Sequence, residues 1–539
     1  MAGLQRWHTA LLGLGALAAA GFGLHRANRL PKRHARRTPA PAVSGETTLS
    51  RVAKEMAAQH PGLSGLHLLA DGVDAFAARY LLVKAAERTL DLQYYIWHGD
   101  RTGTLLLEAV HEAAQRGVRV RLLLDDNGIT GLDRVLAALN DHPNIEVRIF
   151  NPFRIRYPKA IGFLVDFGRL NRRMHNKSFT VDGAVTIVGG RNVGDEYFGA
   201  GDGALFADLD VLALGPVAGE VEADFERYWI SESAYPARQI LPILGRAQRR
   251  KLVRRASVVE SDASARQYVE RLRSLPIVRE AAEGTLDLEW AEVRMISDDP
   301  AKVVRDLDYA NLLAGKLDSA IGRPQRELAI VSGYFVPGEE GTAQLSAYAQ
   351  QGVKVTVLTN GYSSTDVALV HAGYVPWRRR LLRAGVRLFE TAAEVHEEPS
   401  RKDRRKERRK GRRLGIGSNL RPTGSGSFAA LRSGASTVHA KTITADRERL
   451  FVGSFNFDPR SMRLNTELGF VIDSPLLAAQ VADAFETIIP AVAYEVTLDA
   501  QGRLRWSDED GTETREPGMG LLDSAMIAVA SRLPIGWLL

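Results

Sequence analysis

Two segments of the sequence place histidine, lysine, aspartate and asparagine at the same spacing. The first reads HNKSFTVDGAVTIVGGRN from His175, and the second reads HAKTITADRERLFVGSFN from His439. Each of the four residues in the second segment follows its counterpart in the first by 264 positions. Four matched positions without a gap indicate that the chain contains two homologous halves. The matched pairs are His175 and His439, Lys177 and Lys441, Asp182 and Asp446, and Asn192 and Asn456.

Within each segment, the histidine and the lysine are expected to face the same ligand. Side chains alternate between the two faces of an extended strand, so residues two apart lie on one side. A second apolar strand that returns after a turn would bring the asparagine beside them. Two such units would present two imidazoles, two ammonium groups and two amides to one tetrahedral anion. A phosphodiester is the substrate that fits this set of groups.

These groups suffice for phosphoryl transfer. One histidine can attack phosphorus while the other protonates the leaving alkoxide, and the lysines and asparagines stabilise charge on the oxygens. No metal and no cofactor are required by this inventory. A carboxylate on the other ring nitrogen would orient each histidine, and we expect Glu467 (NTELGF) and Asp208 (FADLDV) in that role. Asp182 and Asp446 fall at the turns, where we expect them to anchor the hairpins structurally.

Repeated secondary-structure patterns precede both motifs. Residues 89–97 (TLDLQYYIW) and 118–126 (VRVRLLLDD) read as strands with a helical segment between them, and residues 327–337 and 353–360 repeat that order. Apolar, β-branched runs that alternate with helices predict crossover connections and a mixed sheet with helices on both faces. The sequence therefore predicts an α/β fold built from two similar lobes.

We expect five segments along the chain, with a basic insertion at 400–427 in the second lobe. The insertion is rich in Gly and Ser and is interpreted as a flexible surface element, with a plain solvated loop as the alternative. The apolar tail from Met519 is either a core-packing element or a membrane-surface element. The segments are an anchor and basic linker (1–40), lobe 1 (41–244), a helical linker (245–284), lobe 2 (285–498) and a C-terminal tail (499–539).

The positive charge of the chain is concentrated in two short strips. The chain carries a formal net charge of +7, whereas residues 1–40 hold seven Lys/Arg without an acid and residues 401–413 hold ten bases and two acids. The remaining body is therefore acidic, which argues against a groove for nucleic acid. We expect the basic strips at 26–37 and 401–413 to contact an anionic membrane surface. The absence of cysteine excludes disulfides and thiolate zinc sites, but it fits a reducing and an oxidising compartment equally well.

An apolar, uncharged stretch near the N-terminus runs from Thr9 to Leu24. A basic cluster follows it and only Arg6 precedes it, so by the positive-inside rule we expect an uncleaved anchor with the catalytic body in the cytoplasm. A cleaved secretory signal, with export of the body, is the alternative. Burial of this stretch in a soluble core is the least favoured interpretation.

With these motifs, the chain resembles the phospholipase D superfamily and, within it, the bacterial cardiolipin synthase C-type branch. The resemblance also rests on LDLQYYIW from Leu90, on SSTDVALVHAGYVPWRRRLLRAGVRLFE from Ser363 and on the C-terminal LPIGWLL. It implies a duplicated phospholipase D fold whose two lobes form one active site at a pseudo-twofold interface. It also implies a ping-pong reaction through a phosphohistidine, with His175 as nucleophile and His439 as general acid and base. The reverse assignment of the two histidines stays open.

The activity that the resemblance implies is phosphatidyl transfer at the bacterial inner membrane. Cardiolipin would form from phosphatidylglycerol and a second phospholipid, either another phosphatidylglycerol or phosphatidylethanolamine. Hydrolysis of phospholipid headgroups is the first alternative, a nuclease of the same superfamily is less favoured, and a non-catalytic lipid-binding scaffold would require a missing catalytic residue. The sequence leaves open which lipid donates, whether a protein partner is needed, and the oligomeric state.

Overall fold

The structure is a computed structural model that describes residues 23, 26, 28–33, 46–200, 204–248, 250–252, 263–365, 367–391, 423–424, 436–509 and 511–532. The expected anchor at Thr9–Leu24, apart from Gly23, and the basic strip at 401–413 lie outside these residues, as does nearly all of the insertion at 400–427. Among the helices that are described, none is long and apolar enough to cross a membrane.

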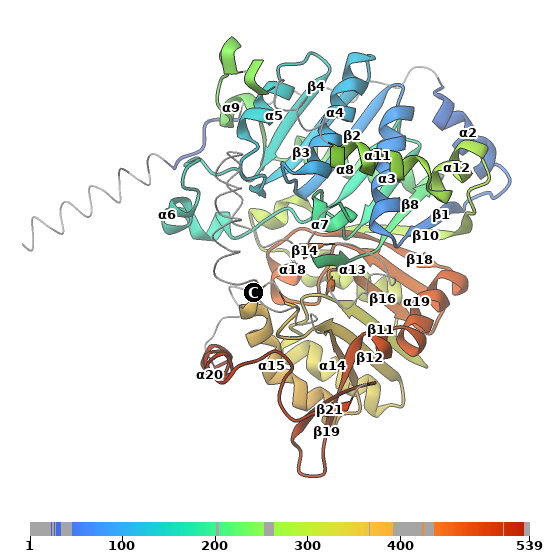
Figure 1. Cartoon of the computed structure of the whole chain (residues 1–539), viewed down its shortest axis with the longest axis vertical. Coiled ribbons are helices and arrows are strands. Elements are labelled where there is room, and N and C mark those ends of the chain that lie inside the picture. The colour runs from blue at the N-terminus through green and yellow to red at the C-terminus, as the bar shows by residue number, and fades with distance from the viewer. Residues whose placement is uncertain are drawn as a thin grey trace, which may run out of the picture.

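The first lobe is built on a mixed sheet of eight strands (Figure 1). Strands β2, β3 and β4 are parallel, and the remaining neighbours in the order β9-β4-β3-β2-β5-β6-β8-β1 are antiparallel. The strands are β1 (Ser64–Leu69), β2 (Thr89–Ile96), β3 (Arg119–Gly128), β4 (Ile145–Phe150), β5 (Ser178–Val181), β6 (Val185–Gly189), β8 (Asp210–Leu214) and β9 (Ala234–Pro236).

The second lobe repeats this arrangement strand for strand. Its parallel strands are β11, β12 and β13, and the order is β19-β13-β12-β11-β16-β17-β18-β10, extended beyond β19 by a hairpin. The predicted α/β class and internal duplication are therefore confirmed. The strands are β10 (Glu289–Ser297), β11 (Glu327–Ser332), β12 (Lys354–Asn360), β13 (Arg387–Thr391), β16 (Lys441–Ala445), β17 (Arg449–Gly453), β18 (Leu468–Asp473), β19 (Ala493–Leu498), β20 (Leu504–Asp508) and β21 (Gly511–Glu513).

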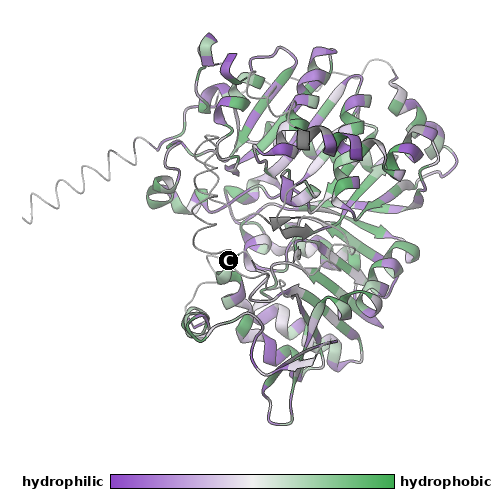
Figure 2. Ribbon diagram, viewed as in Figure 1, coloured by the Kyte–Doolittle hydropathy of each residue, from purple (hydrophilic) through white to green (hydrophobic). Residues whose placement is uncertain are grey.

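Helices cover both faces of each sheet, which explains the apolar character of the strands in Figure 2. In lobe 1, alternate strand residues pack against α3 and α4 on one face and against α8 on the other. In lobe 2, α13, α14 and α15 cover one face and α19 covers the other. These helices are α3 (Gly72–Ala85), α4 (Arg101–Gln115), α8 (Pro216–Ile230), α13 (Leu313–Ile321), α14 (Gly338–Gln350), α15 (Ala368–Arg383) and α19 (Pro475–Thr487).

The remaining helices are short or connect the lobes. Helices α11 and α12 fall in the expected linker and pack on lobe 1, where the Tyr268 hydroxyl donates to the Phe198 carbonyl at 2.8 Å. Short 3₁₀ turns occupy Pro300–Val303, Tyr309–Asn311 and Ile489–Ala491. The helices are α2 (Thr48–Ala57), α5 (Asp133–Leu139), α6 (Ala160–Leu170), α7 (Asp195–Phe198), α9 (Ala237–Ile240), α11 (Ala263–Arg273), α12 (Pro276–Glu283), α18 (Pro459–Arg463) and α20 (Leu521–Ala530).

The two lobes are joined by backbone pairing and by a shared core. Strand β1 pairs with β10 antiparallel, so the two sheets are continuous at their β1 and β10 edges. A buried apolar cluster below this junction contains Leu66, Val188 and Val211 from lobe 1 together with Val452 and Phe470 from lobe 2. An apolar interface of this kind holds the lobes in one fixed relation. A site shared between them can therefore be pre-organised.

The motif aspartates lie in equivalent turns and bind backbone amides. Asp182 has φ +52° and Asp446 has φ +55°, a left-handed conformation that aspartate tolerates better than most residues. The Asp182 carboxylate accepts the N–H groups of residues 87, 88 and 89 at 2.8 to 3.1 Å. The Asp446 carboxylate likewise accepts those of residues 325, 326 and 327. Each aspartate thus ties its turn to the start of the neighbouring parallel strand, β2 or β11.

We expect Asp182→Ala to lower the free energy of unfolding by about 2 to 3 kcal/mol, because three N–H donors, of which that of Thr89 is buried, lose their acceptor. Asp446→Ala should cost less, since Asp446 is partly exposed and water can replace the carboxylate. Urea denaturation followed by circular dichroism measures both changes, and turnover per folded molecule should stay near that of the wild type. Loss of turnover in a normally stable Asp182→Ala protein would instead give Asp182 a direct chemical role.

Candidate active site

Two short parallel pairings between the lobes position the motif histidines. Met174 pairs with Thr466, and the next residues are His175 and Glu467. On the other side, β7 (Ala204–Ala207) pairs with β15 (Ser436–Val438) and with β14 (Thr423–Gly424), and Ala207 lies opposite Val438. The residues that follow this second pairing are Asp208 and His439. Each histidine is therefore placed beside a carboxylate of the opposite lobe.

Both pairs make short, buried contacts. The Nδ1 atom of His175 lies 2.8 Å from Oε2 of Glu467. The Nδ1 atom of His439 lies 2.5 Å from Oδ2 of Asp208. The structure therefore brings together the histidine and carboxylate residues that the sequence pointed to. With Nδ1 oriented by a carboxylate, Nε2 is the ring nitrogen that reacts with a substrate.

Asp208 and Glu467 occupy equivalent positions although they are different residue types. Gly189 of β6 pairs with the β8 residue that lies two positions after Asp208. In the same way, Gly453 of β17 pairs with the β18 residue that lies two positions after Glu467. At both glycines the opposite strand comes so close that a Cβ atom would lie 2.5 or 2.6 Å from a backbone Cα. Glycine at these positions therefore permits the close strand approach that places each carboxylate.

The two motif lysines act on both histidines. The Nζ atom of Lys177 donates to the backbone oxygen of His175 at 2.5 Å, and Lys441 donates to that of His439. The positive charges of Lys177 and Lys441 each lower the pKa of both histidines. All four groups therefore belong to one electrostatic site. Two ammonium groups at this site suit a singly charged phosphodiester.

Burial shifts the pKa values of the two histidines in the same direction. Burial, with Lys177 and Lys441, lowers the pKa of His175 well below its ordinary value. Burial and Lys441 lower the pKa of His439 to about 4, although Asp208 opposes the shift. Both rings are therefore neutral at pH 7 in the substrate-free protein. A neutral imidazole is the form that can attack phosphorus.

The two orienting carboxylates differ in their electrostatics. Burial raises the pKa of Glu467 to about 7, against the opposing charge of Lys177. Burial also raises the pKa of Asp208, but His439 and Lys441 outweigh this effect and hold the pKa well below its ordinary value. Asp208 is thus a fixed anion, whereas Glu467 titrates near neutrality. The duplicated site is chemically asymmetric.

The two motif asparagines differ in their contacts. Asn192 accepts the N–H of Ile96 at 3.1 Å and donates to the hydroxyl of Tyr197 at 3.0 Å. The ring of Tyr197 packs edge-on against His439, with the centroids 5.3 Å apart. Asn456 is buried, and its Oδ1 atom has no hydrogen-bond partner among the residues that the structure describes. Direct contact of either asparagine with substrate stays a prediction.

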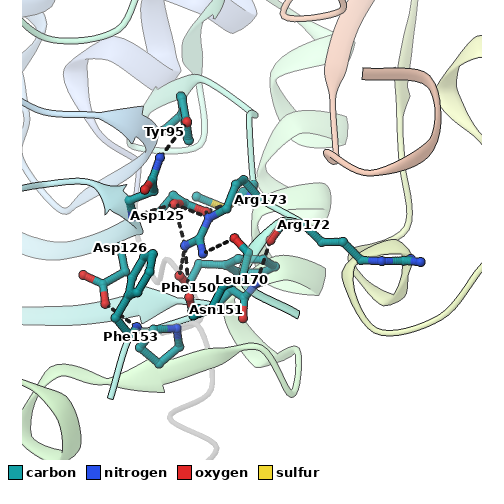
Figure 3. A network of polar contacts seen from close by, with 12 residues as sticks. Tyr95, Asp125, Asp126, Phe150, Asn151, Phe153, Leu170, Arg172 and Arg173 are labelled. Atoms are coloured by element: carbon teal, nitrogen blue, oxygen red, sulfur yellow. Dashed lines mark hydrogen bonds and ion pairs between the residues drawn. The ribbon is translucent and has the colours of Figure 1, made fainter. Parts of the chain in front are cut away.

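A buried network at the end of β3 holds the backbone before His175 (Figure 3). The carboxylate of Asp125 accepts from Nε of Arg173 at 2.9 Å and from the Met174 N–H at 2.9 Å. The Arg173 guanidinium also donates to the carbonyl oxygen of Asn151 at 3.0 Å, and Figure 3 shows these bonds as dashed lines. Beside the network, the Tyr95 ring lies edge-on to His175 with centroids 5.0 Å apart. The sequence reasoning missed this network, and its only signal was a pair of aspartates ending an apolar strand.

One cluster has the composition of a cation site. Among the residues that the structure describes, His98, Asp100 and Glu196 form the one set of three whose ligand atoms lie within 4.8 Å of one another. Nδ1 of His98 pairs with Glu196 at 2.7 Å, and Asp100 caps α4 by accepting the Gly103 N–H. These contacts give each residue a structural partner within the protein.

Comparison with known proteins decides the family. The profile described as "Cardiolipin synthase, PLD-like domain" matches residues 81–229 and 317–489, which include both histidine motifs. Cardiolipin synthase C of Escherichia coli is 46% identical over 488 residues, covering 90% of this chain and 98% of that protein. The chain belongs to the phospholipase D-like cardiolipin synthase family. The family and branch predicted from the motifs are confirmed.

More distant relatives of this family share the same architecture. An uncharacterized protein of Helicobacter pylori is 30% identical over 442 residues, and coverage is 81% of each chain. The crystal structure of phosphatidylserine synthase from Haemophilus influenzae matches with a TM-score of 0.55 at 13% identity, covering 90% of this chain and 98% of that one. That likeness supports the bilobal phospholipase D fold of this family member.

The electrostatics predict a narrow, bell-shaped pH dependence of kcat/KM centred near pH 7. Burial lowers the pKa of Lys177 to about 7, so its ammonium form is lost above that pH. Burial raises the pKa of Glu467 to about 7, so its carboxylate form is lost below that pH. Lys177→Arg should extend the alkaline limb, because a guanidinium stays charged. Initial rates of lipid transfer from pH 5 to pH 9 in both proteins measure this. An alkaline limb that is identical in Lys177→Arg would contradict the assignment.

Proposed function

We propose that the chain is a phosphatidyltransferase that makes cardiolipin from phosphatidylglycerol and a second phospholipid. The observation that carries this proposal is the crossed pair of histidine–carboxylate contacts, His175 with Glu467 and His439 with Asp208, in a member of the cardiolipin synthase family. Crossing between the lobes supports the action of one nucleophile and one proton donor on a single anion. That is the requirement for double displacement at phosphorus.

In the first half-reaction, Nε2 of His175 attacks the phosphorus of a phosphatidyl donor. The bond between phosphorus and the headgroup oxygen breaks, and protonated His439 gives its Nε2 proton to the leaving alkoxide. When the phosphodiester binds, its negative charge raises the proton affinity of His439, the ring takes up a proton from water, and the Asp208 anion stabilises the imidazolium. Lys177 and Lys441 stabilise the charge on the phosphoryl oxygens.

In the second half-reaction, the glycerol hydroxyl of phosphatidylglycerol replaces the headgroup. His439 accepts the hydroxyl proton, the oxygen attacks phosphorus, and the bond to Nε2 of His175 breaks. Cardiolipin leaves and both histidines return to their starting state. Water in place of the acceptor would yield phosphatidic acid by the same route.

The substrates and the location are part of the proposal. Phosphatidylethanolamine is the proposed donor and phosphatidylglycerol the acceptor, as expected for the C-type branch that the sequence resembles. The bacterial inner membrane is the proposed location, with the basic strips at 26–37 and 401–413 on anionic lipid.

Product analysis with purified full-length protein tests the activity. Phosphatidylglycerol carrying an isotopic label in its glycerol headgroup is supplied in mixed micelles, with and without phosphatidylethanolamine. We expect labelled cardiolipin by mass spectrometry, formed faster when phosphatidylethanolamine is present. Phosphatidic acid as the sole product from every lipid pairing would favour the hydrolase alternative and contradict the proposal.

A further inference from the structure

Two helices, one from each lobe, expose apolar side chains to solvent. On α20, the side chains of Leu521, Leu522, Met526 and Val529 are 62 to 82% exposed, although their spacing gathers them on one face. On and before α6, Leu164 is 84% exposed and Tyr157 is 93% exposed. Exposed apolar groups gathered in this way mark an interaction surface. Within residues 519–532, the part of the apolar tail that the structure describes, Ile527 of α20 is the buried residue and so carries the core-packing role considered for the tail.

Both helices lie at the edge of the sheets that carries the active site. Helix α6 belongs to the connection between β4 and β5, directly before His175. The Asn151 side chain, just after β4, donates to the backbone carbonyl oxygens of Arg169 and Arg172 at the C-terminal end of α6. Figure 1 shows α6 and α20 on the same side of the molecule, the left side of the view.

The residues just before α20 contact lobe 2 close to the second motif histidine, His439. Gly518 lies against Ser363, in the loop that follows β12. The next residue of that loop, Ser364, accepts through its carbonyl from Thr437, two residues before His439. Glu516 anchors this approach further through Arg378 of α15 at 2.9 Å. The exposed face of α20 is thus held at a fixed position relative to the second histidine.

Basic residues border both apolar faces. Arg29 is exposed next to Asn28, which contacts Asp166 of α6 at 3.3 Å, and Lys32 is exposed where its carbonyl accepts from Gln239. Arg515 and Arg532 are exposed on either side of α20. In the sequence, the apolar stretch Thr9–Leu24 ends four residues before Asn28. Exposed apolar side chains with basic residues next to them suit the surface of an anionic bilayer.

We infer that the exposed faces of α6 and α20 insert together into the surface of an anionic lipid bilayer and hold the active-site edge of both lobes against it. A planar surface contacts two separated patches at once, whereas a groove for a peptide would need them to be contiguous. The inference deepens the proposed function, because it states how a lipid-modifying site meets its substrate.

Single-cysteine labelling tests the inference in the full-length protein, which has no cysteine of its own. Leu164→Cys and Leu522→Cys would carry an environment-sensitive fluorophore, and Leu476→Cys on α19 is the matched control. Leu476 is 54% exposed, and α19 lies on the opposite side of the view in Figure 1. With vesicles of phosphatidylglycerol and phosphatidylethanolamine, we expect blue-shifted emission and quenching by nitroxide-labelled lipid at positions 164 and 522, but not at 476.

A charge variant gives a second readout. Leu521→Glu combined with Leu522→Glu should lower turnover on vesicles by about ten-fold and leave turnover on detergent-dispersed lipid unchanged. Equal quenching at all three positions, or none at 164 and 522, overturns the inference. A blue shift that depends on protein concentration and not on lipid would assign the faces to a second copy of the chain and would also overturn it. Quenching does not depend on catalysis, so quenching without cardiolipin formation would refute only the proposed function.

Discussion

Replacing either motif histidine, by His175→Asn or His439→Asn, should reduce cardiolipin formation by about 10⁴-fold or more. The two rings are not interchangeable, because each donates its Nδ1–H to a different carboxylate and has a different neighbourhood. Loss of His175 removes the nucleophile, and loss of His439 removes the proton donor to the headgroup oxygen. Asparagine retains a polar side chain of similar reach, so the fold should persist.

The measurement is the initial rate of cardiolipin formation in mixed micelles, paired with thermal unfolding to confirm the fold. His67→Asn is the matched control, because His67 lies on β1 and its Nδ1 atom contacts the Asp287 carbonyl at 3.0 Å. That variant should transfer lipid at a rate near that of the wild type. A rate within ten-fold of the wild type for either motif variant would show that the two histidines do not form one catalytic pair.

The second large effect concerns the orienting carboxylates. Asp208→Asn should lower kcat by about 10³- to 10⁴-fold, in the range of other histidine-orienting aspartates, whereas Glu467→Gln should cost about ten- to a hundred-fold. The reason is that Asp208 is held as an anion by His439 and Lys441, and this charge stabilises the imidazolium that forms on His439. Glu467, with its pKa raised to about 7 by burial, supplies less charge at neutral pH.

A double-mutant cycle separates an orienting role from a merely structural one. If Asp208 acts through His439, then adding Asp208→Asn to His439→Asn should cause little further loss of turnover. Multiplicative losses in the double variant, or a larger loss from Glu467→Gln than from Asp208→Asn, would contradict the assigned asymmetry. Urea unfolding of each variant excludes a simple loss of folded protein.

The duplicated motifs predicted most of the site because strand geometry is local. His175 and Lys177 share a face by alternation, and the common offset to His439 and Lys441 already required a repeated unit. For the same reason, the positions of Asp182 and Asp446 at turns predicted a structural role for them and not a chemical one. The alternation of strands and helices likewise predicted the α/β class.

Glu467 and Asp208 were expected to orient the histidines, but which carboxylate meets which histidine could not be predicted, because that depends on tertiary pairing. Nothing local in the sequence states that Met174 pairs with Thr466 or that Ala207 pairs with Val438, yet these pairings decide which carboxylate meets which histidine. The network of Asp125 and Arg173 depends on β3 meeting a distant loop. The electrostatic asymmetry also required the structure, since it reflects burial that two similar motifs do not reveal.

The most direct test of the central claim is the site of the covalent intermediate. A phosphatidyl donor with isotopically labelled phosphate and a good leaving group is mixed with the enzyme, and the reaction is quenched in base, digested and examined by mass spectrometry. We predict label on His175 in the wild type, more label in His439→Asn because the second half-reaction is blocked, and none in His175→Asn. Label on His439 in place of His175 would reverse the assigned roles, and turnover without any labelled histidine would contradict the account.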